Sequence, residues 1–176
     1  MSFLPPMRRV VQRYPEREPL DVRAAVAAAC KAFRPGIRPG ARIALGVGSR
    51  GITGLAEMVA ATIGFLRAAG AEPFIVPAMG SHGGATPEGQ KAILAGYGVT
   101  EEAMEVPIRA SLETRRIGTS AEGVPVHCSV EALAADVAFG GPVDGVRKLH
   151  VVGRHRLGDR PGGAACLEKI AGHLLP

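Results

Sequence analysis

The chain has 176 residues, of which 47% are hydrophobic but only 4% aromatic, so length and composition predict one domain with an aliphatic core. The net charge of +5 favours anionic ligands, whereas the scarcity of aromatic side chains that could stack on bases argues against nucleic acid. Three cysteines without a paired motif, and the absence of a membrane-length apolar run, favour a soluble cytoplasmic protein over a disulfide scaffold or a membrane protein.

The first third of the chain predicts a strand, a helix and a second strand. Residues 7–15 are expected to form a short strand, and residues 19–33 an Ala-rich helix with Asp21 near its positive end. After a break at "RPGIRPG", residues 41–51 read as a strand that ends in small residues.

The clearest helix covers residues 53–70. Its apolar positions repeat at helical spacing, Thr53 is the expected N-cap, and Gly70 ends it. Residues 72–80 form the next predicted strand. The start of a further helix is indicated by a cap residue, a first-turn proline and a first-turn acid, which are Thr86, Pro87 and Glu88.

The later part of the chain has a different pattern. Residues 112–129 predict two short strands around a "SAEG" turn, and residues 130–135 a short helix. Residues 151–176 read as a basic loop and a terminal helix. The whole pattern predicts an α/β fold: a mostly parallel sheet with flanking helices in a Rossmann-like three-layer arrangement, plus a short β-hairpin.

Two predicted strands end in glycine-rich loops, "GVGSRG" and "MGSHGG". The first loop carries Ser49 and Arg50, and the second carries Ser81 and His82. Ligands of parallel sheets bind at the carboxyl ends of strands, and the helices that follow these loops favour an anion at their N-termini. If the strands are neighbours, a guanidinium for carboxylate or phosphate and an imidazole for proton transfer face one crevice.

A purely structural interpretation stands beside this one. Arg50 could form a surface ion pair, and His82 could cap a loop backbone. The string "GVGSRG" matches neither the dinucleotide fingerprint nor the phosphate-binding loop that ends in GK[ST]. The expectation therefore rests on the paired placement of the two side chains.

The strings "IALGVGSRGI", "AGAEPFIVPAMGSHGGATPEGQ", "LAGYGVTEEAMEVPIR" and "GVPVHCS" resemble the N-terminal domain of the nickel-dependent lactate racemase family. The similarity is greatest to its uncharacterised lactate-racemase-domain members. It runs from about Met7 to Asp136 and resumes at "GPVDGVRKLHVVG". The resemblance implies racemisation or epimerisation of a 2-hydroxy acid, by hydride transfer to and from a nickel pincer mononucleotide.

The same resemblance implies roles for particular residues. His82 matches the first of two histidines that exchange the hydroxyl proton, and Arg50 matches the arginine of the first substrate and cofactor loop. Ser49, in that loop, is expected to contact the cofactor, and Lys148 matches the lysine that carries it. The expected ligand is a small 2-hydroxy acid or another carboxylate.

The sequence also departs from the family pattern. About a dozen residues that would hold the second histidine are missing between "AADVAF" and "GGPVDG". The stretch that matches the nickel-ligating region, "RPGGAACLE", has no histidine, so no metal ligand is assigned. His150 is interpreted as packed in a strand and His155 as solvated. Residues 1–176 are expected to form a single domain without the family's second domain, and the activity of this chain alone is expected to be impaired.

Two alternatives remain open at this stage. One is a non-catalytic anion- or nucleotide-binding or assembly module, whose exposed sheet edge pairs with another chain, as in a homo-oligomer. The other is a truncated or frameshifted gene product. The cysteines Cys30, Cys128 and Cys166 are interpreted as small buried residues.

Overall fold

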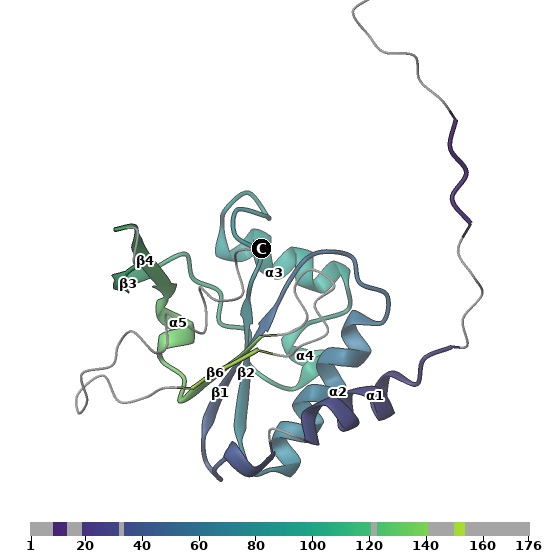
Figure 1. The fold of residues 1–176 in the computed structure, drawn as a ribbon, viewed down its shortest axis with the longest axis horizontal. Helices are drawn as coiled ribbons and strands as arrows, with labels where there is room; N and C mark the ends of the chain where they lie inside the picture. The colour runs from purple at the N-terminus through teal and green to yellow at the C-terminus, as the bar shows by residue number, and fades with distance from the viewer. Residues whose placement is uncertain (1–8, 14–18, 32–33, 121–122, 141–149, 154–176) are drawn as a thin grey trace, which may run out of the picture.

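A mainly parallel sheet with helices packed against it makes up the body of the molecule (Figure 1). The computed structural model describes residues 9–13, 19–31, 34–120, 123–140 and 150–153. In chain order its elements are α1 (Val22–Lys31), a 3-10 turn (Arg34–Gly36), β1 (Arg42–Val47), α2 (Leu55–Ala68), β2 (Glu72–Pro77), α3 (Pro87–Gly96), α4 (Glu101–Met104), β3 (Thr114–Thr119), β4 (Pro125–Ser129), α5 (Val130–Leu133), β5 (Val137–Gly140) and β6 (His150–Gly153).

Strand β1 lies inside the main sheet, whose order is β2-β1-β5-β6. It pairs in parallel with β2 on one side and β5 on the other, and β6 runs antiparallel to β5. Beyond β2, Ile108 forms a parallel bridge with Ile75. Strands β3 and β4 form a separate antiparallel pair. The predicted α/β fold with a mostly parallel sheet and a short hairpin is therefore confirmed.

Side-chain alternation along the strands gives the sheet two different faces. One face carries Ile43, Leu45 and Val47 of β1, which pack in one cluster with side chains of α1, α2, α3 and α4. The helix residues of this cluster include Cys30, Ile63, Leu66, Leu94 and Met104. The core is aliphatic, as the composition predicts, and it fixes these four helices against one face of the sheet.

The opposite face has a smaller cluster of Ala44, Phe74, Val76 and Ala135. The guanidinium carbon of Arg109 lies 4.4 Å from the centre of the Phe74 ring, which is a cation–π contact. Ala135 lies two residues after the end of α5, so α5 leads the chain onto this face. Helices thus flank the sheet unequally, with the longer ones together on one side (Figure 1).

Three helices were predicted with a particular residue at their start, and for two of them that residue lies where it was expected. Asp21 accepts a hydrogen bond of 2.9 Å from the first turn of α1, and Thr86 caps α3 through a bond of 3.0 Å. The N-cap predicted at Thr53 is wrong. Helix α2 instead follows Gly54, whose φ of 75° is left-handed and which offers no side-chain cap.

The strand predicted over residues 7–15 is also wrong for the part that the structure describes, residues 9–13. Residues 9–13 form no strand, and Val10 is 84% exposed. Two adjacent valines cannot both face one core in a strand, and within the described residues no strand lies beside them. Near the other end, β6 includes His150, which agrees with the strand predicted around it, but it continues to Gly153, so the loop predicted from residue 151 is wrong for residues 151–153.

Candidate functional site

The two glycine-rich loops lie side by side at one edge of the sheet. Strands β1 and β2 are parallel neighbours, with Val47 in register with Pro77. The N–H of Ala78 donates to the carbonyl of Val47 at 2.8 Å, which extends the pairing into the loops. The side chains that follow each strand are therefore close together, as the sequence predicts.

The loop that carries His82 folds back onto the first turn of α3. Gly83 has a φ of 70°, and a Cβ added to it would lie 2.3 Å from the carbonyl carbon of Gly89. A Cβ added to Gly89 would lie 1.8 Å from the carbonyl oxygen of Gly83. Only glycine fits at either position, so this backbone contact explains the spacing of the glycines after His82.

Two polar side chains of α3 hold the same loop. Thr86 donates its hydroxyl proton to the carbonyl of Gly83 at 3.1 Å while it caps the helix. Gln90, which is only 3% exposed, donates from Nε2 to the carbonyl of Gly80 at 2.8 Å. A buried amide satisfied by a loop carbonyl is costly to break, so these bonds fix the path of the chain on both sides of His82.

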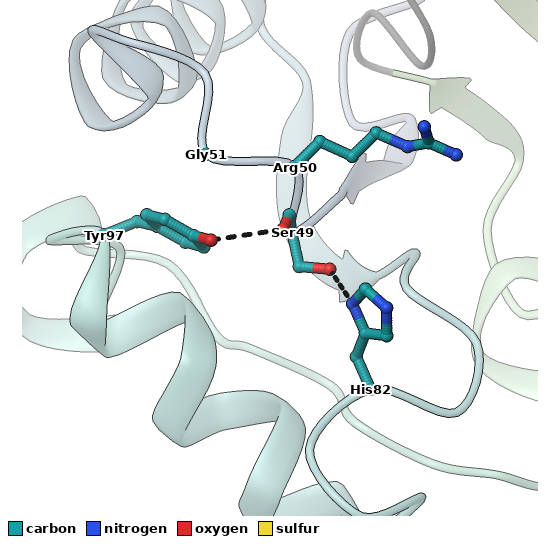
Figure 2. Close-up of a pocket in the computed structure, with 5 residues that line it drawn as sticks. All are labelled: Ser49, Arg50, Gly51, His82 and Tyr97. Atoms are coloured by element: carbon teal, nitrogen blue, oxygen red, sulfur yellow. Dashed lines mark hydrogen bonds between the residues drawn. The ribbon is translucent and has the colours of Figure 1, made fainter. Parts of the chain in front are cut away.

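Between the loops lies an open hollow of about 620 Å³, lined by Ser49, Arg50, Gly51, His82 and Tyr97. The Ser49 hydroxyl and Nδ1 of His82 are 2.5 Å apart, and the Tyr97 hydroxyl donates to the Ser49 carbonyl at 3.1 Å (Figure 2). In this view the Arg50 side chain extends away from Tyr97, on the same side of Ser49 as the His82 ring.

This arrangement combines one positive charge with one proton-transfer group. Arg50 and His82 are both exposed, so a ligand from solvent can reach them. A guanidinium binds carboxylate or phosphate through paired hydrogen bonds. Because Ser49 occupies Nδ1 of His82, Nε2 is the ring nitrogen left to exchange a proton with a ligand.

Three of the four predicted site residues are brought together here: Ser49, Arg50 and His82. The fourth, Lys148, lies outside the described residues. Sequence reasoning missed Tyr97. Its available signal was a lone aromatic residue between two glycines at the end of the helix that follows His82.

The remaining histidines and cysteines lie away from the hollow or outside the described residues. His127 belongs to the hairpin, with Nδ1 3.5 Å from the Thr114 hydroxyl. Cys30 is buried, as predicted, and burial raises the pKa of its thiol. Cys128 is half-buried. The described structure does not cover His155, Cys166 or His173.

In the residues that the structure covers, no group of three or more His, Cys, Asp or Glu side chains is placed to hold a metal ion. None of the helices described there has the length and apolarity that a membrane crossing requires.

Comparisons of the chain with protein-family models, with curated proteins and with solved structures found no match.

Proposed function

We propose that this chain binds a small 2-hydroxy acid in the hollow between the two loops, as a domain of the hydroxy-acid racemase and epimerase type. Arg50 would hold the substrate carboxylate, and His82 would exchange the proton of the substrate hydroxyl. One observation supports the proposal most directly: His82, bonded to Ser49, lines the same hollow as Arg50 at the ends of neighbouring strands. The sequence resemblance supplies the reaction class.

The proposed reaction requires His82 to exchange a proton with the substrate hydroxyl. A carbinol carbon gives up hydride readily only when its hydroxyl proton leaves with it. An imidazole with one nitrogen held by Ser49 can present the other to that proton, while Arg50 balances the negative charge of the ligand. Both groups are exposed, so the substrate needs no rearrangement of the core to reach them.

The nickel pincer mononucleotide implied by the resemblance carries a phosphate besides its metal. The hollow suits the anionic part of such a molecule, because Arg50 lines it and Gly51 has no side chain to obstruct approach. When bound, this group would accept hydride from the substrate carbon and return it. Lys148, the expected tether, is not among the described residues, and the described residues contribute no metal cluster.

Lactate binding tests the carboxylate role of Arg50. We expect Arg50→Gln to weaken lactate binding at least about tenfold, because a charge-assisted hydrogen bond contributes more than about 1.4 kcal/mol. Isothermal titration of the purified chain measures this. Arg38→Gln is the matched control, since it removes the same charge from an exposed position before β1, away from the loops. Equal affinities for the two variants would overturn the assignment.

A second candidate is a binding module without turnover. Inversion at a carbon needs a proton-transfer group on each side of the substrate, and among the described residues that line the hollow only His82 is a histidine. Loading the chain with the pincer cofactor and adding each lactate enantiomer separates the candidates. Binding without interconversion supports the module, whereas interconversion that is lost in His82→Gln supports the enzyme.

A further inference from the structure

Tyr97, which lines the hollow, also links the two loops through Ser49. Its hydroxyl donates to the Ser49 carbonyl at 3.1 Å, and the Ser49 hydroxyl lies 2.5 Å from Nδ1 of His82 (Figure 2). Backbone and side chain of one serine are therefore engaged from opposite sides. The position of the His82 ring depends on Ser49, and the position of Ser49 depends on Tyr97.

Helix α3 connects both ends of this chain of hydrogen bonds. Its first turns hold the His82 loop through Thr86 and Gln90, and Tyr97 follows its last residue as the C-cap. Leu94, with 0% exposure, anchors the helix in the core, and the half-buried Tyr97 ring packs against the same cluster. One rigid element thus sets where both loops lie relative to each other.

We infer that Tyr97 is a positioning residue that, through Ser49, holds His82 in one tautomer and one ring orientation, with Nδ1 at the Ser49 hydroxyl. A serine hydroxyl can accept from Nδ1–H or donate to an unprotonated Nδ1, and in either case Nε2 is the ring nitrogen left to face a ligand. The proton-exchanging use of Nε2 rests on the proposed function. The network that fixes the ring does not, because both hydrogen bonds are present in the chain itself.

Removing the Tyr97 hydroxyl should free the His82 ring from this hydrogen-bond network. In Tyr97→Phe the aromatic ring still fills its place in the core, but the Ser49 carbonyl loses its donor. Nitrogen NMR of histidine-labelled protein at alkaline pH, where imidazoles are neutral, reports which ring nitrogen carries the proton. His127, on the separate hairpin with its own Nδ1 3.5 Å from the Thr114 hydroxyl, should keep its signals in every variant, and free histidine supplies the tautomer ratio of an unconstrained ring.

In the wild type we expect His82 to populate one tautomer. In Tyr97→Phe and in Ser49→Ala we expect a mixture of both tautomers that resembles that of free histidine at the same pH. Thr100→Ala is the matched control: it removes one hydroxyl hydrogen bond, to the N–H of Ala103 in α4, and should leave the His82 signals unchanged. A wild-type mixture of tautomers, or unchanged His82 signals in Tyr97→Phe, would overturn the inference.

Lactate titration of the same proteins distinguishes this inference from the proposed function. If the wild type binds no lactate but its His82 signals respond to Tyr97→Phe as expected, the positioning role stands and the substrate assignment fails. If lactate binding depends on Arg50 but Tyr97→Phe leaves the His82 signals unchanged, the positioning role fails and the proposed substrate stands.

Discussion

Glu101 is an exposed side chain that joins separate segments of the fold. Its carboxylate accepts a hydrogen bond from the N–H of Ile108 at 2.8 Å and pairs with Lys91 at 3.1 Å. Ile108 in turn bridges to Ile75 of β2, so Glu101 ties α3 and α4 to the outer side of the sheet. The backbone hydrogen bond, and after it Lys91, lower the pKa of the Glu101 carboxyl.

Replacing Glu101 by Gln should remove part of the pH dependence of stability. Because the pKa is lowered in the folded state, its contribution is present above the ordinary value of 4.5 and is lost as the pH falls through the folded value. We expect Glu101→Gln to be less stable than the wild type at neutral pH and to approach it in acid. Urea unfolding over this pH range provides the measurement.

The control for this prediction is Glu102→Gln, which removes the same charge from the same helix but leaves the bonds to Ile108 and Lys91 in place. It should follow the wild-type pH profile more closely than Glu101→Gln does. A constant difference between Glu101→Gln and the wild type at every pH would mean that the carboxylate charge has no role in joining the segments.

The site residues differ in how far the sequence could predict them. Ser49, Arg50 and His82 were predictable because each lies in a glycine-rich loop that follows a strand, and the ends of parallel neighbours meet. Tyr97 was not, because it contacts Ser49 across 48 positions of sequence. That contact depends on how the end of α3 packs, which no local pattern contains.

Helix α3 contains two glycines, Gly89 and Gly96, in opposite environments. Gly89 is pressed against the backbone of Gly83, where an added Cβ would lie 1.8 Å from the carbonyl oxygen. An added Cβ at Gly96 would meet nothing within 4 Å. The first glycine is therefore required by the packing of the His82 loop. The second has no such packing role, and its main effect is the extra conformational freedom that glycine gives the unfolded chain.

Alanine substitutions at these two positions should shift stability in opposite directions. We expect Gly89→Ala to cost about 1–3 kcal/mol, because the loop or the helix must move to admit the methyl group. Gly96→Ala should stabilise by about 0.5–1 kcal/mol. Denaturant unfolding of both variants measures the changes. A Gly89→Ala variant that is as stable as the wild type would contradict the close contact between Gly83 and Gly89.

Elements with a long periodic signal were predictable, and short ones were less so. The apolar spacing of residues 53–70 predicted α2 within a few residues, although the start was misplaced because Gly54, not Thr53, sets the entry angle. Helix α4 was missed because it is only 4 residues long. Thr100 is the N-cap residue of α4, but no apolar repeat follows it in the sequence to indicate a helix.

The strand order of the whole sheet depends on contacts between distant segments. The N–H of Arg42 donates to the Asp136 carboxylate at 2.9 Å, and the N–H of Asp136 donates to the Arg42 carbonyl at 2.8 Å, across 94 positions. The Arg42 guanidinium also donates to the Ala134 carbonyl at 2.5 Å. These bonds set β5 beside β1. The alternation of strands and helices predicted a parallel sheet, but it carried no information about which strand lies on that side.

The two sheets of the described structure differ in how far their residues are paired and buried. Strand β1 has a paired neighbour on each side, and most of its side chains are buried. Strands β3 and β4 pair only with each other in the described structure, and every one of their residues is exposed or half-buried. A two-stranded hairpin without a buried face is marginal in water, so its hydrogen bonds should open without unfolding of the main sheet.

Native-state hydrogen exchange should reveal this difference directly. We expect amides in the centre of β1, such as those of Ala44 and Leu45, to exchange only through global unfolding, because their opening breaks pairing on both sides and exposes the core. Paired hairpin amides should have protection factors at least about 100-fold smaller. Mild denaturant should accelerate exchange in β1 while leaving the hairpin nearly unaffected. Equal protection, with equal denaturant dependence, would mean that hairpin and sheet unfold as one cooperative unit and that the hairpin has a buried face in solution.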